Sequence, residues 1–354
     1  MHNLLCDYQK VYQMLEDEES RDIYLNRLNA MISGDCRYIA HIVTAYQPSL
    51  PLRNGKTIQD LIASMPKDRK IVLYGAGTYA RENLKNWAGD QRFAGFCSRT
   101  KRKQAHGYLG FPVMSPEELL SQQEYSVVIN TTDARDEILQ VLREGGYPES
   151  LIYETGPYTG ANDPGQYFAP SFMKYEDEEV FVDAGSCNLA TAIKLRNYCG
   201  HVKKVYAFEP DPESYRRCLE RREETGFWEA EVLPYGTWSS RETLCFHALG
   251  TGASKVSEEG AIRIPVMPID EAVSAEECVT MIKMDVEGSE LESLKGARKT
   301  IQRDRPKLAI CVYHKPEDMT EIPLYVKELV PEYRLYLRHH SNDGRETVLY
   351  AVMP

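Results

Sequence analysis

The 354-residue sequence lacks the features that mark secreted and membrane proteins. No apolar run approaches the roughly 20 residues that a membrane-spanning helix needs, and the opening residues MHNLLCDYQK lack the apolar core of a signal peptide. The nine cysteines include no Cys-x-x-Cys pair, and their odd number argues against a disulfide framework. We therefore expect an unprocessed cytoplasmic protein with reduced thiols and no membrane partner.

An excess of basic side chains is also missing. The 42 Lys and Arg residues are outnumbered by 53 Asp and Glu residues, which gives a formal net charge of −11 at pH 7. This charge would repel a phosphate backbone, so we do not expect nucleic acid as a partner. The chain is too long for one ordinary core and predicts two or more domains, without indicating an oligomeric state.

Changes in the hydrophobic pattern divide the chain into four regions. Residues 1–65 predict a helical N-terminal region, because apolar positions recur there at helical spacing. Residues 66–154 contain the strand candidates KIVLY, FAGFC and YSVVINTT with helices between them, and predict a small Rossmann-like α/β domain. The Gly- and Pro-rich segment 155–170 has no periodicity and predicts a linker or lid. Residues 171–354 form the last region.

This last region predicts a larger α/β domain. Strand candidates such as EVFVDAG, VKKVYAFEP, TMIKMDVE and KLAICVYH alternate with helices, so we expect a mostly parallel sheet with right-handed crossovers. The final strand candidates, YRLYLRHH and ETVLYAVM, are joined through Asn342-Asp343-Gly344, a strong hairpin-turn pattern. The last strand should therefore run antiparallel, which is the outline of a class I methyltransferase.

The strand ends of this domain carry candidate ligand-binding residues. In IKMDVEGSEL, residues 282–291, a short apolar strand ends at Asp285 and Glu287. Ligands of open α/β sheets bind outside the carboxyl ends of the strands, so we expect these acids to face a ligand. Asp183 and Gly185 end another strand, where a glycine lets the backbone approach a ligand held on the next helix's N-terminal amides.

Two further strand ends suit a nucleoside. Glu209 can accept hydrogen bonds from both ribose hydroxyls, with Asp211 close behind it. The alternative is that Glu209 only caps the following helix. After the next strand, Gly236 and Trp238 offer an adenine ring a flat apolar wall, unless Trp238 simply belongs to the core.

The motifs FVDAGS, VYAFEPDP, IKMDVEGSELESLKGA and RPKLAICVYHKPEDMTEIPLYVKEL occur in this order. Together they resemble the FkbM family of S-adenosylmethionine-dependent methyltransferases, over about residues 165–354. The resemblance implies a class I fold and methyl transfer to a hydroxyl, commonly on a sugar or polyketide-type acceptor. One position departs from the family pattern, because Leu189 stands where a second glycine usually occurs in the opening loop. The implied S-adenosylmethionine-binding residues are Asp183, Gly185, Ser186, Asn188, Glu209, Asp211, Gly236, Trp238 and Asp285.

Methyl transfer from a sulfonium requires alignment of the acceptor oxygen and one base, because the methyl group is already activated. The candidate catalytic residues are Asp285, Glu287 and His314, which follow neighbouring strands. We favour His314 as the base, since an unperturbed histidine has a pKa of about 6.5 and can act near neutrality. Glu287 would then orient the acceptor or serve as the base instead, with Asp285 on the cofactor side. Alternatively, His314 is a structural histidine without a catalytic role. Separately, Lys283 could pair with an acid as a buried salt bridge.

No metal is expected. The sequence contains no His-x-x-x-His, no paired Asp-Asp and no Cys-His spacing that would define a coordination shell. His339 and His340 could reach the rim of the site beside Arg338. Strand alternation allows at most one of the two to do so.

The small α/β domain has a Gly-x-Gly turn, at Gly75 and Gly77, between its first strand and helix, with Ala80 at the third glycine position. After the second strand, Ser98 and Arg99 replace the acid that would hold an unphosphorylated ribose, which could favour a phosphate. A nucleotide, a nucleotide sugar or NADP are the possible ligands, and a scaffold without a ligand is the alternative. The whole chain is accordingly a sugar-directed O-methyltransferase with a small-molecule or glycan acceptor, or else a non-catalytic nucleotide-binding module or an NADP oxidoreductase.

Overall fold

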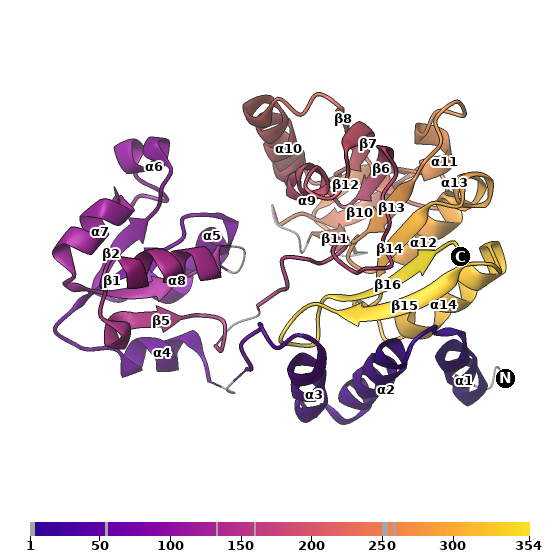
Figure 1. Ribbon diagram of the computed structural model, residues 1–354. Coiled ribbons are helices and arrows are strands. Elements are labelled where there is room, and N and C mark those ends of the chain that lie inside the picture. The colour runs from indigo at the N-terminus through magenta and orange to yellow at the C-terminus, as the bar shows by residue number, and fades with distance from the viewer. Residues whose placement is uncertain (1–3, 54–55, 132–133, 159–160, 250–253, 258–259) are drawn as a thin grey trace. The chain divides into compact units, whose positions relative to one another are not determined.

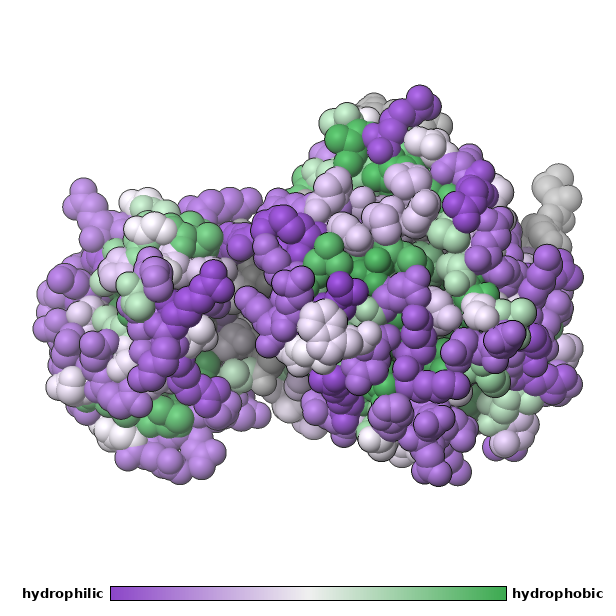
Figure 2. Space-filling model, turned by 90° about the horizontal axis from the view of Figure 1, so that it is seen from above, coloured by the Kyte–Doolittle hydropathy of each residue, from purple (hydrophilic) through white to green (hydrophobic). Residues whose placement is uncertain are grey.

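The computed structural model describes residues 4–53, 56–131, 134–158, 161–249, 254–257 and 260–354, which fold into two compact units (Figure 1). The large unit comprises residues 1–42, 165–340 and 344–354, and the small unit comprises 43–164 and 341–343. Within the described ranges, none of the helices combines the length and apolarity that crossing a membrane would require. On the face seen in Figure 2, hydrophilic residues predominate on both units and hydrophobic residues form smaller patches.

The large unit is built on a seven-stranded sheet with the order β15-β16-β14-β13-β6-β7-β8. All neighbouring strands pair in parallel except β16, which runs antiparallel to both β14 and β15. The predicted mostly parallel sheet with a reversed last strand is thus confirmed. Its strands are β6 (Glu178–Ala184), β7 (His201–Phe208), β8 (Ala230–Leu233), β13 (Met281–Met284), β14 (Lys307–Cys311), β15 (Arg334–His339) and β16 (Thr347–Val352).

Helices pack against this sheet, so its central strands are buried, although Asp183 in β6 and Lys283 in β13 interrupt their apolar runs. Every residue of β13 is buried, as are the last six of β6. The parallel strands direct their carboxyl ends to one edge, where the ends of β6, β7, β13 and β14 meet. The helices assigned to this unit are α1 (Leu4–Met14), α2 (Glu18–Ser33), α9 (Ala190–Leu195), α10 (Pro212–Thr225), α11 (Ile269–Ala272), α12 (Glu290–Gly296), α13 (Arg298–Asp304) and α14 (Asp318–Leu329), while α3 (Arg37–Tyr46) spans the division between the units.

A second sheet of four short strands belongs to the same unit, in the order β11-β10-β12-β9. Strand β10 is the segment ETLCFH. Phe246, Ile264 and Val266 form a small apolar cluster on this sheet. The strands are β9 (Gly236–Thr237), β10 (Glu242–His247), β11 (Lys255–Val256) and β12 (Ile262–Met267).

Helices α1 and α2 complete the large unit and lie beside α14 and β15 (Figure 1). The backbone amide of Glu16 donates to the carbonyl of Leu335 over 2.9 Å. Arg338 of β15 forms ion pairs of 2.6 Å with Asp17 and 3.1 Å with Glu19. The described helices up to residue 42 therefore belong to the large unit, whereas the sequence predicted a separate helical region over residues 1–65.

The segment predicted as a linker or lid, residues 155–170, divides between the two units after residue 164. Tyr167 and Phe168 are buried in the core of the large unit. The Phe168 ring contacts Phe181 edge-on and also packs against Tyr198. These aromatic contacts, which the Gly- and Pro-rich composition did not reveal, make the end of this segment part of the core.

The small unit is an α/β layer structure around an all-parallel sheet of order β3-β2-β1-β4-β5. The predicted strands KIVLY, FAGFC and YSVVI are β1, β2 and β4. The strands are β1 (Lys70–Tyr74), β2 (Phe93–Cys97), β3 (Val113–Met114), β4 (Tyr125–Ile129) and β5 (Ile152–Glu154). The helices are α4 (Ile58–Ser64), α5 (Thr78–Trp87), α6 (Lys101–His106), α7 (Pro116–Gln122) and α8 (Arg135–Glu144), with a 3₁₀ turn at Glu149–Leu151.

Candidate functional site

The site is built around a close backbone contact between the ends of β6 and β13. Gly185 has a φ of +81°, and a Cβ atom there would lie 2.0 Å from the carbonyl oxygen of Asp285. Only glycine fits this position, because both the left-handed backbone and the close approach exclude a side chain. The loop after β6 is thus held against the Asp285 corner.

A cavity opens at this edge of the sheet, between the strand ends and the small four-stranded sheet. Of the predicted cofactor residues, Gly185, Glu209, Gly236 and Asp285 line it. Its lining consists of Gly185, Cys187, Phe208, Glu209, Pro210, Gly236, Thr237, Phe246, Ser254, Val256, Ile264, Val266, Asp285, Val286, Glu287 and Ser289. The cavity therefore combines carboxylates at the sheet edge with an apolar wall from the second sheet.

Glu209 is the buried carboxylate of this cavity, with 6% of the residue exposed. Its Oε2 accepts a hydrogen bond of 2.7 Å from the Cys187 amide, and its Oε1 accepts one of 2.8 Å from the Asp211 amide. Burial raises the pKa of Glu209 to about 7, against the lowering effect of these two amides. The alternative that Glu209 caps α10 is wrong, because Asp211 is the N-cap and accepts from the amides of Glu213 and Ser214.

Asp183 differs from the prediction, because it is fully buried and does not line the cavity. It forms an ion pair of 3.1 Å with Lys283, whose side chain is 2% exposed. The Lys283 ammonium also donates to the carbonyls of Ala184 and Gly185, over 3.2 and 2.7 Å. The pair thus lies beneath the Gly185 loop and holds it, and the predicted pairing of Lys283 with an acid is confirmed.

Other predicted cofactor residues also lie outside the cavity lining. Trp238 packs in the apolar cluster of the second sheet, so that Phe246, Ile264 and Val266 take its expected place as the wall. Ser186 is 2% exposed, and Asn188 accepts a hydrogen bond from the Ala190 amide. Asp211 is occupied as the cap of α10 and also accepts from Ser254 Oγ over 2.9 Å.

Leu189, at the position of the departure from the family glycine, has a φ of +63° and a fully buried side chain. This is the left-handed region that glycine prefers, so the leucine backbone is strained there. Its side chain packs in the core and does not line the cavity. The departure therefore affects the loop's conformation rather than the space for a ligand.

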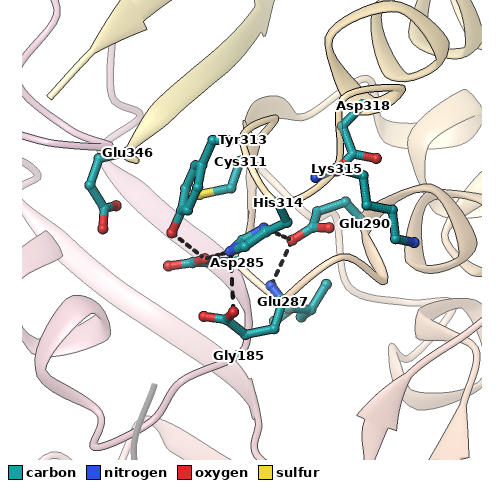
Figure 3. A network of polar contacts seen from close by, with 12 residues as sticks. Gly185, Asp285, Glu287, Glu290, Cys311, Tyr313, His314, Lys315, Asp318 and Glu346 are labelled. Carbon is teal, nitrogen blue, oxygen red and sulfur yellow. Dashed lines mark hydrogen bonds and ion pairs between the residues drawn. The ribbon is translucent and has the colours of Figure 1, made fainter. Parts of the chain in front are cut away.

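Asp285 is held at the corner by two tyrosines that the sequence did not identify (Figure 3 shows Tyr313). Tyr167 donates to its Oδ2 over 2.9 Å, and Tyr313 donates to its Oδ1 over 3.3 Å. Burial alone would raise the pKa of Asp285, but the charges of Lys283 and His314 and the hydrogen bonds from Tyr167 and Cys311 lower it. Asp285 is consequently a fixed, ionised carboxylate.

His314 lies three residues beyond β14, next to the two acids of the corner (Figure 3). Its Nδ1 is 2.9 Å from Glu290 Oε1, and its Nε2 is 3.5 Å from Asp285 Oδ1 and 3.6 Å from Glu287 Oε2. Burial lowers the pKa of His314, but Glu287, Glu290 and Asp285 outweigh it and raise that pKa to about 11. The premise of an unperturbed histidine is therefore wrong, since three carboxylates surround the ring.

His339 and His340 are internal to the fold and do not reach the rim as the sequence had suggested. His339 Nδ1 lies 2.9 Å from the hydroxyl of Thr347, and His340 Nε2 lies 2.9 Å from that of Tyr350. Both histidines are at most 2% exposed. Arg338, expected beside them, is engaged by the acids of α2 and its N-cap.

The predicted ligand residues of the small unit are engaged within that unit. Arg99 pairs with Glu137, and the carbonyl of Gly77 accepts a hydrogen bond of 2.8 Å from the Tyr108 hydroxyl. Lys103 donates to the carbonyl of Ala76 in the same loop. The structure lends no support to the nucleotide or NADP site proposed for this unit.

Comparison with known proteins bears on the large unit. The model of the family described as the methyltransferase FkbM domain matches residues 160–343. The hexuronic acid methyltransferase AglP of Haloferax volcanii is 34% identical over 134 residues, which cover 36% of this chain and 53% of that protein. The chain thus spans about half the length of this curated relative.

Two solved structures are similar at lower identity. The methyltransferase FkbM of Methylobacillus flagellatus is 20% identical, with a TM-score of 0.46, over 92% of this chain and 100% of that chain. SMU.1697c of Streptococcus mutans, a putative methyltransferase in complex with SAH, is 16% identical, with a TM-score of 0.32, over 49% of this chain and 89% of that chain.

Proposed function

We propose a sugar-methylating activity for this chain, which belongs to the FkbM family of S-adenosylmethionine-dependent methyltransferases. The proposed acceptor group is a hydroxyl of a sugar or another polyhydroxylated small molecule or glycan. One observation carries the proposal: a single cavity is lined both by Glu209 and by the acids Asp285 and Glu287. The hexuronic acid methyltransferase among the relatives supports a sugar acceptor.

The residues of the cavity fit S-adenosylmethionine. Gly185 leaves the backbone open at the sheet edge, and Glu209 offers a carboxylate suited to ribose hydroxyls. Phe246, Ile264 and Val266 supply apolar surface for an adenine ring. Bound there, the cofactor would supply a methyl group on a sulfonium, whose sulfur keeps the electron pair when the methyl carbon bonds the acceptor oxygen.

The protein must then orient the acceptor hydroxyl and accept its proton. Asp285, Glu287 and His314 form the cluster that we assign to this task. Glu287 lines the cavity, whereas His314 lies behind it with 8% of its side chain exposed. We therefore assign Glu287 as the base that accepts the hydroxyl proton. The sequence had left Glu287 open as the alternative to His314. We assign His314 instead to positioning the two acids.

The small unit is proposed to be a Rossmann-like module that serves as a scaffold. Its all-parallel order β3-β2-β1-β4-β5 is the order used by dinucleotide-binding folds. The engagement of Arg99 by Glu137 supports a scaffold over a phosphate site.

The test is calorimetry with S-adenosylmethionine, followed by incubation of the full chain with hexuronic acids and neutral hexoses. Mass spectrometry should detect an acceptor heavier by one methylene group. Mild alkali then separates the products, because it cleaves a methyl ester but leaves the expected methyl ether intact. No cofactor binding at millimolar concentration would refute the proposal. Binding without transfer to any acceptor would favour a non-catalytic binding module.

A further inference from the structure

The fold brings three metal-ligating side chains together from two separate loops. Asp285 and Glu287 follow β13, and His314 follows β14. Each offers one ligand atom, and these atoms all lie within 4.8 Å of one another. Figure 3 shows the three side chains pointing toward a common point. The sequence indicated these three residues as catalytic candidates but predicted no metal, because they do not have a recognisable ligand spacing.

The distances within this group are too long for good hydrogen bonds. His314 Nε2 lies 3.5 and 3.6 Å from the nearest oxygens of Asp285 and Glu287. Hydrogen bonds from nitrogen to oxygen are usually 2.7–3.2 Å long. Ligands at about 2.1 Å from an octahedral ion lie about 3 Å from one another. Small side-chain movements would therefore suffice to bring all three ligands to a common ion.

An independent observation comes from the state of His314. Its side chain is 8% exposed, and among the described residues neither of its ring nitrogens has a hydrogen-bond partner of good geometry. The other ring nitrogen, Nδ1, lies 2.9 Å from Glu290 Oε1. This contact keeps Nδ1 turned toward Glu290, so that Nε2 is the ring nitrogen directed at the two acids. A histidine whose other nitrogen faces a carboxylate in this way is the usual arrangement of a metal ligand.

The other groups of the site are held by their neighbours too. Asp285 is oriented by the hydroxyls of Tyr167 and Tyr313. Glu290 is fully buried, and its Oε1 also accepts a hydrogen bond of 2.9 Å from the Val286 amide. Outer contacts of this kind orient metal ligands and contribute to affinity.

We propose that Asp285, Glu287 and His314 together bind one divalent cation such as Mn²⁺. Two carboxylates and one imidazole suit a cation of intermediate hardness. An octahedral cation bound by these three side chains would retain coordination positions that the protein does not fill. These positions face the corner where the acceptor is proposed to lie, so the ion would bind acceptor oxygens, while Glu287, which offers one oxygen to the ion, keeps its other oxygen for the proton. That role, unlike the site itself, rests on the proposed methyltransferase function.

The test uses the full chain, freed of metal by chelation and dialysis and then titrated with Mn²⁺. Electron paramagnetic resonance should report the binding of about one ion per chain. His314→Ala and Glu287→Gln should abolish this binding at the same concentrations, and Glu290→Gln should weaken it by about 10–100-fold. Glu292→Gln is the matched control. The Glu292 carboxylate on α12 accepts hydrogen bonds from Ser239 and Lys295, so its replacement should leave Mn²⁺ binding unchanged.

Calorimetry with S-adenosylmethionine on the same samples checks the fold and separates the two proposals. Mn²⁺ binding that is absent at millimolar concentration, or equal in wild type and in His314→Ala, would overturn the metal site. If the cofactor still bound in that case, the proposed function would stand. Mn²⁺ binding lost in His314→Ala, with no cofactor binding by the wild type, would support the metal site and refute the methyltransferase proposal.

Discussion

Replacing Lys283 by methionine should destabilise the large unit by about 3–5 kcal/mol, the usual cost of breaking a buried ion pair. The Lys283 and Asp183 side chains are 2% and 0% exposed and lie 3.1 Å apart. The substitution would leave the Asp183 carboxylate in the core without its counter-charge. It would also remove the hydrogen bonds that the Lys283 ammonium donates to the carbonyls of Ala184 and Gly185. These hydrogen bonds hold the loop after β6.

The assay is thermal unfolding by calorimetry, with Lys204→Met as the control in the same unit. Lys204 pairs with Glu231 over 2.7 Å, but the two side chains are 31% and 48% exposed. An exposed pair contributes no more than about 1 kcal/mol. The Lys283 variant should melt on the order of 10 °C below the wild type, and the control within a few degrees of it. Equal losses in both variants would refute the argument from burial.

Three other predictions concern the cavity and its supports. Because the ionised Glu209 carboxylate accepts more ribose hydrogen bonds than the protonated one, affinity for S-adenosylmethionine should rise with pH through about 7. Calorimetry should find this slope abolished in Glu209→Gln. Gly185→Ala should cost more than the about 1–2 kcal/mol of a left-handed alanine, and more than Gly34→Ala, which has a φ of +69° and open space around it. Equal losses of unfolding free energy in the two variants, measured by urea unfolding, would contradict this clash. Asp211→Ala should cost about 1 kcal/mol as a lost helix cap, and an unchanged urea midpoint would count against that role.

The positions of the site acids could be predicted because they depend on a local pattern. Apolar runs that alternate with helical segments identify parallel strands, and the residues just after them lie at the ligand-binding edge. Glu209, Asp285 and Glu287 follow this rule, and all three line the cavity. Trp238 was expected to line the cavity but does not. It follows the two-residue strand β9, and its side chain packs against the apolar cluster of the second sheet.

The electrostatic state of the site could not be predicted, because it depends on contacts between distant segments. His314 meets Glu290 of α12 and the acids after β13, and these contacts rather than the ring itself determine its pKa. Tyr167 reaches Asp285 from a segment whose composition suggested only a linker. Tyr313 had one available indication, since it immediately precedes His314 within a recognised motif.

The pairing of β16 has a consequence for dividing the protein into fragments. The family match ends at residue 343, but β16 begins at Thr347 and lies between β14 and β15 in the sheet. A fragment limited to residues 160–343 would lose this strand, leaving the facing edges of β14 and β15 unpaired, and unpaired strand edges promote aggregation. It would also lack α2, whose N-cap Asp17 pairs with Arg338. An autonomously folding piece should therefore include both α2 and β16, and expression of the matched span alone should yield insoluble protein.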